Sequence, residues 1–72
     1  MSLCNRLKEI RVARNLTQEA LAQAVGVTRQ SIIAIEKAKY VPSVRLALEL
    51  ARALDDSLED IFWLVEDEGG RG

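Results

Sequence analysis

Apolar residues recur along this chain at the spacing of amphipathic helices, and short polar stretches interrupt the pattern. Leu3, Leu7 and Ile10 lie three or four residues apart, which predicts a first helix from Leu3 to Ala13. Further segments repeat this spacing, and each begins at or just after a Ser or Thr that can cap a helix. They cover about residues 17–26, 28–37, 44–54 and 57–61. The pattern predicts an all-α fold, a compact five-helix domain.

The segment Phe62–Val65 does not follow the helical spacing, because its residues are all apolar. In an extended strand, Trp63 and Val65 would lie on one face and Phe62 and Leu64 on the other. Since the pattern shows no other strand, the same segment of a second chain would be its partner across a twofold axis. A helix end that packs into the domain's own core is the alternative, and both remain open. The interpretation divides the chain into a domain of residues 1–62 and a tail of residues 63–72, a candidate dimerisation strand followed by a disordered end.

At 72 residues the chain is one small domain, of a size that buries only about 60% of the surface exposed by the unfolded chain. One cysteine cannot form an intramolecular disulfide, and no histidine is present to help hold zinc. Tight helix packing and self-association are the remaining sources of stability. We therefore expect no metal or other cofactor.

The same composition argues against catalysis and against a membrane. No histidine is available as a general base. Cys4 lies in the predicted first helix, where a lone cysteine most often packs as a small apolar side chain. No apolar run approaches the roughly 20 residues of a membrane span, and no secretory leader is visible. We expect a cytoplasmic protein that is not an enzyme.

Charge is divided unevenly along the chain. Residues 1–45 carry eight Lys and Arg against three Glu, a net charge of +5, whereas residues 46–72 carry two Arg against eight acidic residues, a net charge of −6. A basic half joined to an acidic half can place one face on phosphates and turn the other away. Two ordinary solvated faces would give the same division, so charge alone does not decide the function.

The segment from Gln18 to Glu36 carries the features of a helix-turn-helix. Ala22 is small enough for two helices to meet there, and Gly26 tolerates the positive φ that a sharp turn needs. Ile32 and Ile35 can anchor the underside of the second helix. The combination of these residues at these offsets is far more specific than any one of them.

These residues resemble the XRE/Cro-type helix-turn-helix family, which includes the lambdoid phage repressors. The likeness rests on QEALAQAVG from Gln18, RQSI from Arg29 and IEK from Ile35, and it covers nearly the whole chain. It implies a transcriptional regulator that binds double-stranded DNA, as a homodimer on a palindromic operator. The family also includes antitoxins and restriction-modification controllers, so a protein-interaction module with the same fold is the alternative. No effector pocket or second domain is apparent, so we expect no small-molecule effector.

The resemblance implies that helix 28–37 lies in the DNA major groove and that Arg29 and Gln30 read base edges. Arg can hold guanine and Gln can hold adenine with two hydrogen bonds, each pair discriminating by about 1–3 kcal/mol. Thr28 and Ala34 would add methyl contacts to thymine. Backbone phosphates would be held by Thr17, Gln18, Ser31, Lys37, Lys39 and Tyr40.

The resemblance also implies a structural role for Arg11 and Glu36, as a buried ion pair between two helices. Two positions depart from the family pattern. Ala38 stands where glycine is usual, so a positive φ there would cost about 1–2 kcal/mol or reshape the loop. Ile33 stands where a small polar residue often lies near the phosphates, and an exposed Ile cannot donate a hydrogen bond.

Overall fold

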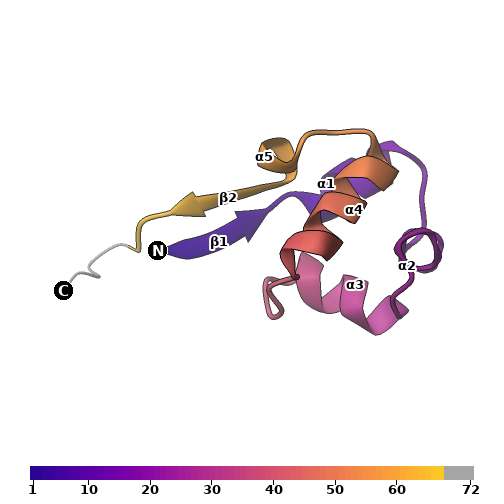
Figure 1. Ribbon diagram of the computed structural model, residues 1–72, viewed down its shortest axis with the longest axis horizontal. Helices are drawn as coiled ribbons and strands as arrows, with labels where there is room; N and C mark the ends of the chain where they lie inside the picture. The colour runs from indigo at the N-terminus through magenta and orange to yellow at the C-terminus, as the bar shows by residue number, and fades with distance from the viewer. Residues whose placement is uncertain (68–72) are drawn as a thin grey trace.

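The computed structural model describes residues 1–67, which form five helices and a two-stranded antiparallel sheet (Figure 1). The helices are α1 (Leu7–Ala13), α2 (Gln18–Val25), α3 (Arg29–Glu36), α4 (Val44–Leu54) and α5 (Leu58–Ile61), and the strands are β1 (Ser2–Asn5) and β2 (Phe62–Val65). The helices form a compact body, and the two strands project from it as a ribbon (Figure 1). The helical architecture is as expected, but the all-α prediction omitted this sheet. The expected disordered end lies outside the described residues.

The N-terminal segment is a strand, so the prediction of a helix from Leu3 was wrong. Residues Ser2–Asn5 form β1, and α1 begins only at Leu7. The Asn5 side-chain oxygen accepts a hydrogen bond from the Leu7 backbone N–H at 3.0 Å, which starts the helix there. Leu3 still packs against the core, but it does so from a strand. Tertiary pairing therefore overrides a spacing that is equally compatible with a helix.

The segment Phe62–Val65 is a strand, as one of the two sequence interpretations held, but its partner lies within the chain. The expectation that a second chain must supply the partner was wrong, because β1 fills that place. The facing pairs are Ser2 with Val65, Leu3 with Leu64, Cys4 with Trp63, and Asn5 with Phe62. Cys4 therefore lies in a strand and not in a helix. The division after residue 62 falls inside β2, so residues 63–65 continue the folded unit.

Four hydroxyl side chains begin helices at the positions that the sequence predicted. Each accepts a hydrogen bond from the backbone N–H three residues later, at 2.9 to 3.2 Å. Such caps satisfy N–H groups that have no acceptor within the helix. The capping residues are Thr17, Thr28, Ser43 and Ser57.

Four helices are followed, within two residues of their last residue, by a residue with positive φ. These residues are Asn15 (φ 60°), Gly26 (φ 76°), Ala38 (φ 60°) and Asp55 (φ 54°). After α3, the N–H of Ala38 donates to the Ile35 carbonyl and that of Lys39 donates to the Ala34 carbonyl, both at 2.9 Å. This pair of bonds is the Schellman motif, which satisfies the last carbonyls of a helix.

The core is built from aliphatic side chains contributed by every helix. Those below 2% exposed are Leu7, Leu21, Ile32, Ile35, Leu50, Leu54 and Ile61. Two of them lie in α3, so this helix is fixed to the body along one side. Among the described residues, no helix is long and apolar enough to span a membrane.

Candidate nucleic-acid interface

The turn between α2 and α3 depends on one small residue and one glycine. Ala22 is 2% exposed, and α2 and α3 pack closely together. At Gly26 a Cβ atom would meet nothing within 4 Å, so space is not what excludes a side chain. The φ of 76° at Gly26 disfavours any side chain there, because L-residues rarely adopt that conformation. The sequence interpretation of both positions agrees with this geometry.

Helix α3 is buried on one side and open on the other. Ile32 and Ile35 are 0% and 1% exposed and hold the helix to the core. Arg29 and Gln30, in the first turn, are exposed, as is the capping residue Thr28. The four residues expected to read bases are therefore close together on α3, with Ala34 half-buried one turn later. The long polar side chains of Arg29 and Gln30 are exposed and can reach a ligand.

The residues expected to hold phosphates lie at the start of α2, in the first turn of α3 and after the end of α3. Thr17 and Gln18 are at the start of α2, and Ser31 is half-buried in the first turn of α3, with its hydroxyl 3.2 Å from that of Thr28. Lys37, Lys39 and Tyr40 follow the end of α3, and all three are exposed. Along the chain, uncharged polar groups of Thr17 and Gln18 thus precede Arg29 and Gln30, and the cationic Lys37 and Lys39 follow them.

Ile33 is half-buried and not fully exposed, which corrects the sequence expectation for that position. Part of its side chain is therefore covered by the protein. It still offers no hydrogen-bond donor.

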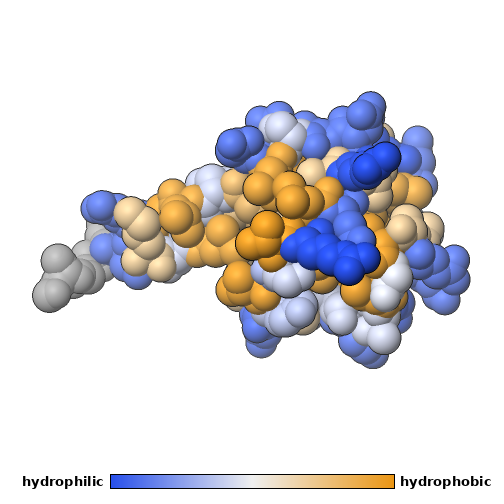
Figure 2. Space-filling model, in the orientation of Figure 1, coloured by the Kyte–Doolittle hydropathy of each residue, from blue (hydrophilic) through white to orange (hydrophobic). Residues whose placement is uncertain are grey.

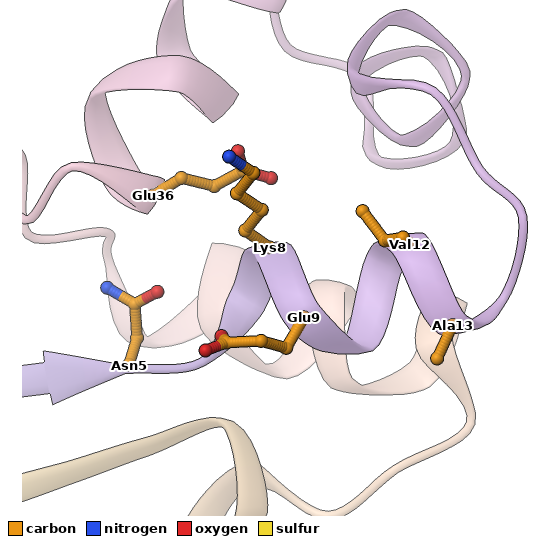
Figure 3. A pocket seen from close by; sticks show the side chains of 6 residues that line it. All are labelled: Asn5, Lys8, Glu9, Val12, Ala13 and Glu36. Carbon is orange, nitrogen blue, oxygen red and sulfur yellow. The ribbon is translucent and has the colours of Figure 1, made fainter.

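A buried ion pair joins α1 to the end of α3. The Nε atom of Arg11 lies 2.6 Å from Oε2 of Glu36, and the two side chains are 9% and 4% exposed. Arg11 also donates to the Leu16 carbonyl at 2.7 Å. Glu36 also lines a pocket between α1 and the end of α3 (Figure 3). The remaining lining residues are Asn5, Lys8, Glu9, Val12 and Ala13.

The loop after α3 adopts the turn that glycine would favour, although the residue is alanine. Ala38 has φ 60°, and the Schellman hydrogen bonds described above are intact. The alternative of a differently shaped loop is therefore wrong. Lys37 and Lys39 flank this turn, so its geometry sets where both ammonium groups lie relative to α3.

Asn5 is a structural residue whose role the sequence did not reveal. Its Nδ2 donates to the Ile35 carbonyl at 2.9 Å while its Oδ1 accepts from Leu7. One amide thus starts α1 and ties it to the end of α3. An Asn just before an apolar helical run was the only available signal, because the contact to Ile35 is long-range.

The expected dimer residues differ in their exposure. Phe62 is 8% exposed and belongs to the core, and Trp63 is half-buried under the Arg6 guanidinium, 4.8 Å from its ring centroid. Leu64 and Val65 are 61% and 40% exposed. Only the outer half of this segment therefore offers a free apolar surface.

That surface continues onto the helical body. Figure 2 shows hydrophobic residues extending from the ribbon onto the adjoining body. A groove at this junction is lined by Leu3, Pro42, Val44, Ala47, Leu58, Glu59, Phe62, Trp63 and Leu64. Val44 and Leu48 of α4 are 74% and 52% exposed. We call the exposed apolar residues Val44, Leu48 and Leu64 the ribbon-side patch; Val65 follows Leu64 in β2 and lies on the opposite face of the ribbon.

Known proteins resemble this chain in sequence over most of its length. A helix-turn-helix family model matches residues 7–61. The uncharacterized HTH-type transcriptional regulator YgzD of Bacillus subtilis is 49% identical over 63 residues, which are 88% of this chain and 96% of that protein. An uncharacterized HTH-type transcriptional regulator of Methanocaldococcus jannaschii is 53% identical over 64 residues, 89% of this chain and 97% of that protein.

Solved structures share the fold. The restriction-modification controller protein C.AhdI of Aeromonas hydrophila superposes with a TM-score of 0.72 at 36% identity, covering 76% of this chain and 80% of that chain. A putative DNA-binding protein of Bacteroides fragilis gives a TM-score of 0.77, covering 83% and 97%, and at 22% identity it shows the fold alone. The chain therefore belongs to the XRE-type helix-turn-helix family of DNA-binding transcriptional regulators, which is not an enzyme family.

Proposed function

We propose that this regulator reads DNA sequence with the exposed side of α3, placed in the major groove. The observation that carries the proposal is the contrast along α3, where Ile32 and Ile35 are buried and Arg29 and Gln30 are free. The Arg29 guanidinium matches the two acceptors of guanine, and the Gln30 amide matches the donor and acceptor of adenine. Thr28 and Ala34 supply methyl groups for thymine.

Phosphate contacts on both sides of α3 would fix its register on the duplex. Contacts of this kind position a protein but carry no sequence information. Lys37 and Lys39 would contribute most of the salt dependence, since each neutralised phosphate releases counterions. The uncharged donors proposed for the same role are Thr17, Gln18, Ser31 and Tyr40.

We further propose that the protein binds as a homodimer through Phe62, Trp63, Leu64 and Val65. Strand exchange is not required, because β1 already pairs with β2. A second copy would instead cover the ribbon-side patch, while Phe62 and Trp63 support the ribbon from within. An isolated two-stranded ribbon is marginally stable in water, so burying its free face would stabilise it. Dimerisation would thus add stability that the core of a domain this small cannot supply by itself.

Twofold symmetry of the protein predicts twofold symmetry of the operator. Two α3 helices would enter successive turns of the major groove, with half-site centres about 34–36 Å apart. The operator would therefore be palindromic, and binding would become weaker when the dimer dissociates.

Selection from a random duplex library at roughly physiological salt tests the proposal. The purified protein should enrich a twofold-symmetric motif, and the double variant Arg29→Ala, Gln30→Ala should lose it. The matched control is Gln23→Ala, Arg52→Ala, which removes the same residue types at exposed positions outside α3. Enrichment by the control together with loss in the α3 variant supports base reading. Failure of the wild type to enrich any sequence would refute the proposal and favour a protein partner for the ribbon-side patch.

A further inference from the structure

The Glu36 carboxylate lies where three helices meet. Its Oε2 accepts a hydrogen bond from Arg11 of α1 at 2.6 Å. Its Oε1 accepts from the Gln18 Nε2 of α2 at 3.1 Å and lies 3.4 Å from a second nitrogen of Arg11. The side chain is only 4% exposed. The ion pair therefore has an additional ligand, a glutamine at the start of the helix-turn-helix.

This contact decides which way the Gln18 amide is oriented. A glutamine amide has a donor end and an acceptor end, whereas a carboxylate can only accept. Glu36 therefore holds the NH₂ end, since the flipped amide would bring two oxygen atoms together. One N–H of Gln18 is donated to Glu36, and within residues 1–67 the second N–H of the same nitrogen has no acceptor.

The available N–H lies at a place suited to an anion. Gln18 is the first residue of α2, and the residue as a whole is half-buried, so it remains partly open to solvent. Backbone N–H groups in a first helical turn have no acceptor within the helix, and the helix dipole is positive there. The Gln18 amide, if its orientation is fixed beside these N–H groups, would already point a donor toward a phosphate oxygen in the free protein.

We propose that Glu36 is a positioning residue for DNA binding, which orients the Gln18 amide so that it donates to a backbone phosphate. The inference rests on the proposed phosphate contact of Gln18. It assigns the buried ion pair a second role beside stability, because Arg11 holds the carboxylate that in turn holds the glutamine. The role differs from that of Lys37 and Lys39, whose exposed side chains are held by no hydrogen bond or ion pair from the part of the chain that the structure describes.

The variant Glu36→Gln tests the orientation itself. Arg11 only donates hydrogen bonds, so the new amide must turn its oxygen to Arg11 and its NH₂ to Gln18. Gln18 must then flip and present its own oxygen where it formerly presented an N–H. The variant Gln18→Met removes the donor while keeping the length of the side chain. Both changes should abolish the same phosphate contact.

Binding is measured on the selected duplex and on duplexes in which single phosphates are replaced by neutral methylphosphonates. Wild-type protein should lose about 10- to 100-fold in affinity at one phosphate of each half-site, the effect of a hydrogen bond to a charged group. Gln18→Met and Glu36→Gln should each bind the native duplex about 10- to 100-fold more weakly and be insensitive to that replacement. In the double variant the two losses should not add. Concentrations are corrected for the folded fraction from circular dichroism.

Several results would overturn the inference. Additive losses, or a Glu36→Gln protein that remains sensitive to the same methylphosphonate, would make Glu36 purely structural while leaving the proposed function intact. A wild-type protein that selects no duplex would instead refute the proposed function and the inference together.

Nuclear magnetic resonance of the wild-type side-chain amides keeps the test decisive if Glu36→Gln does not fold. The Gln18 NH₂ proton that is donated to Glu36 should exchange with solvent at least 10-fold more slowly than the NH₂ protons of the exposed Gln23 and Gln30. One Gln18 proton should shift further when the selected duplex is added. Exchange as fast as that of Gln23 would show that Glu36 does not hold the amide and would overturn the inference.

Discussion

Replacing Ala38 by glycine should stabilise the fold, because this alanine is held at a φ of 60°. The conformation is imposed by the Schellman turn that ends α3, in which Ala38 and Lys39 donate to carbonyls of that helix. A left-handed conformation costs an L-residue about 1–2 kcal/mol. Ala38→Gly removes this strain and keeps both hydrogen bonds.

Part of that gain is lost in the unfolded state. Glycine gives the unfolded chain more freedom than alanine does, which costs about 0.4–1 kcal/mol. The net increase in the free energy of unfolding should be about 0.5–1 kcal/mol. For a domain of this size, about 1 kcal/mol corresponds to a change of roughly 4–8 °C in Tm. We therefore expect Tm to rise by roughly 2–8 °C.

Thermal unfolding followed by circular dichroism measures the change, and Ala53→Gly is the matched control. Ala53 is exposed within α4, so the same substitution there should lower the stability by about 0.5–1 kcal/mol. A higher Tm for Ala38→Gly together with a lower Tm for Ala53→Gly would support the assignment of backbone strain to Ala38. A Tm for Ala38→Gly at or below that of the wild type would refute it.

Three further outcomes follow from the structure. Arg11→Met should lower the free energy of unfolding by about 3–5 kcal/mol in urea titrations, because it leaves the Glu36 charge buried; a double variant that makes both positions apolar should recover most of the loss. Lys39→Gln should weaken binding to selected and scrambled duplexes equally, and should reduce the slope of log K against log salt by about one unit; a loss confined to the selected duplex would contradict this. Leu64→Glu should give a monomer by analytical ultracentrifugation, with a Tm lowered only by the loss of the stability that dimerisation supplies, since this side chain is 61% exposed in one copy; an unchanged dimer would exclude Leu64 from the interface.

The sequence predicted the helix-turn-helix well because its signals are local. A hydroxyl of Thr17 or Thr28 caps the turn that immediately follows it, so the neighbouring residues contain the whole interaction. Gly26 and Asn15 end helices for the same kind of reason, through their own backbone conformation. Ile32 and Ile35 are buried as their spacing indicates.

The sequence did not predict β1, because its pairing partner lies about sixty residues away along the chain. The spacing of Leu3 and Leu7 fits a helix as well as it fits a strand followed by a helix. The link from Asn5 to Ile35 and the contact between Gln18 and Glu36 are equally long-range. Such contacts become visible only when the helices are placed together.

The ratio of affinities for the selected duplex and a scrambled duplex tests the central claim most directly, measured for the wild type and for Arg29→Ala at one salt concentration. Base reading from α3 predicts a wild-type ratio of about a thousand or more. It also predicts that Arg29→Ala lowers the ratio by about 5- to 150-fold, with a much smaller change in affinity for the scrambled duplex. Equal losses on both duplexes, with the ratio unchanged, would make Arg29 a phosphate contact and would contradict the assignment of α3 as the reading helix.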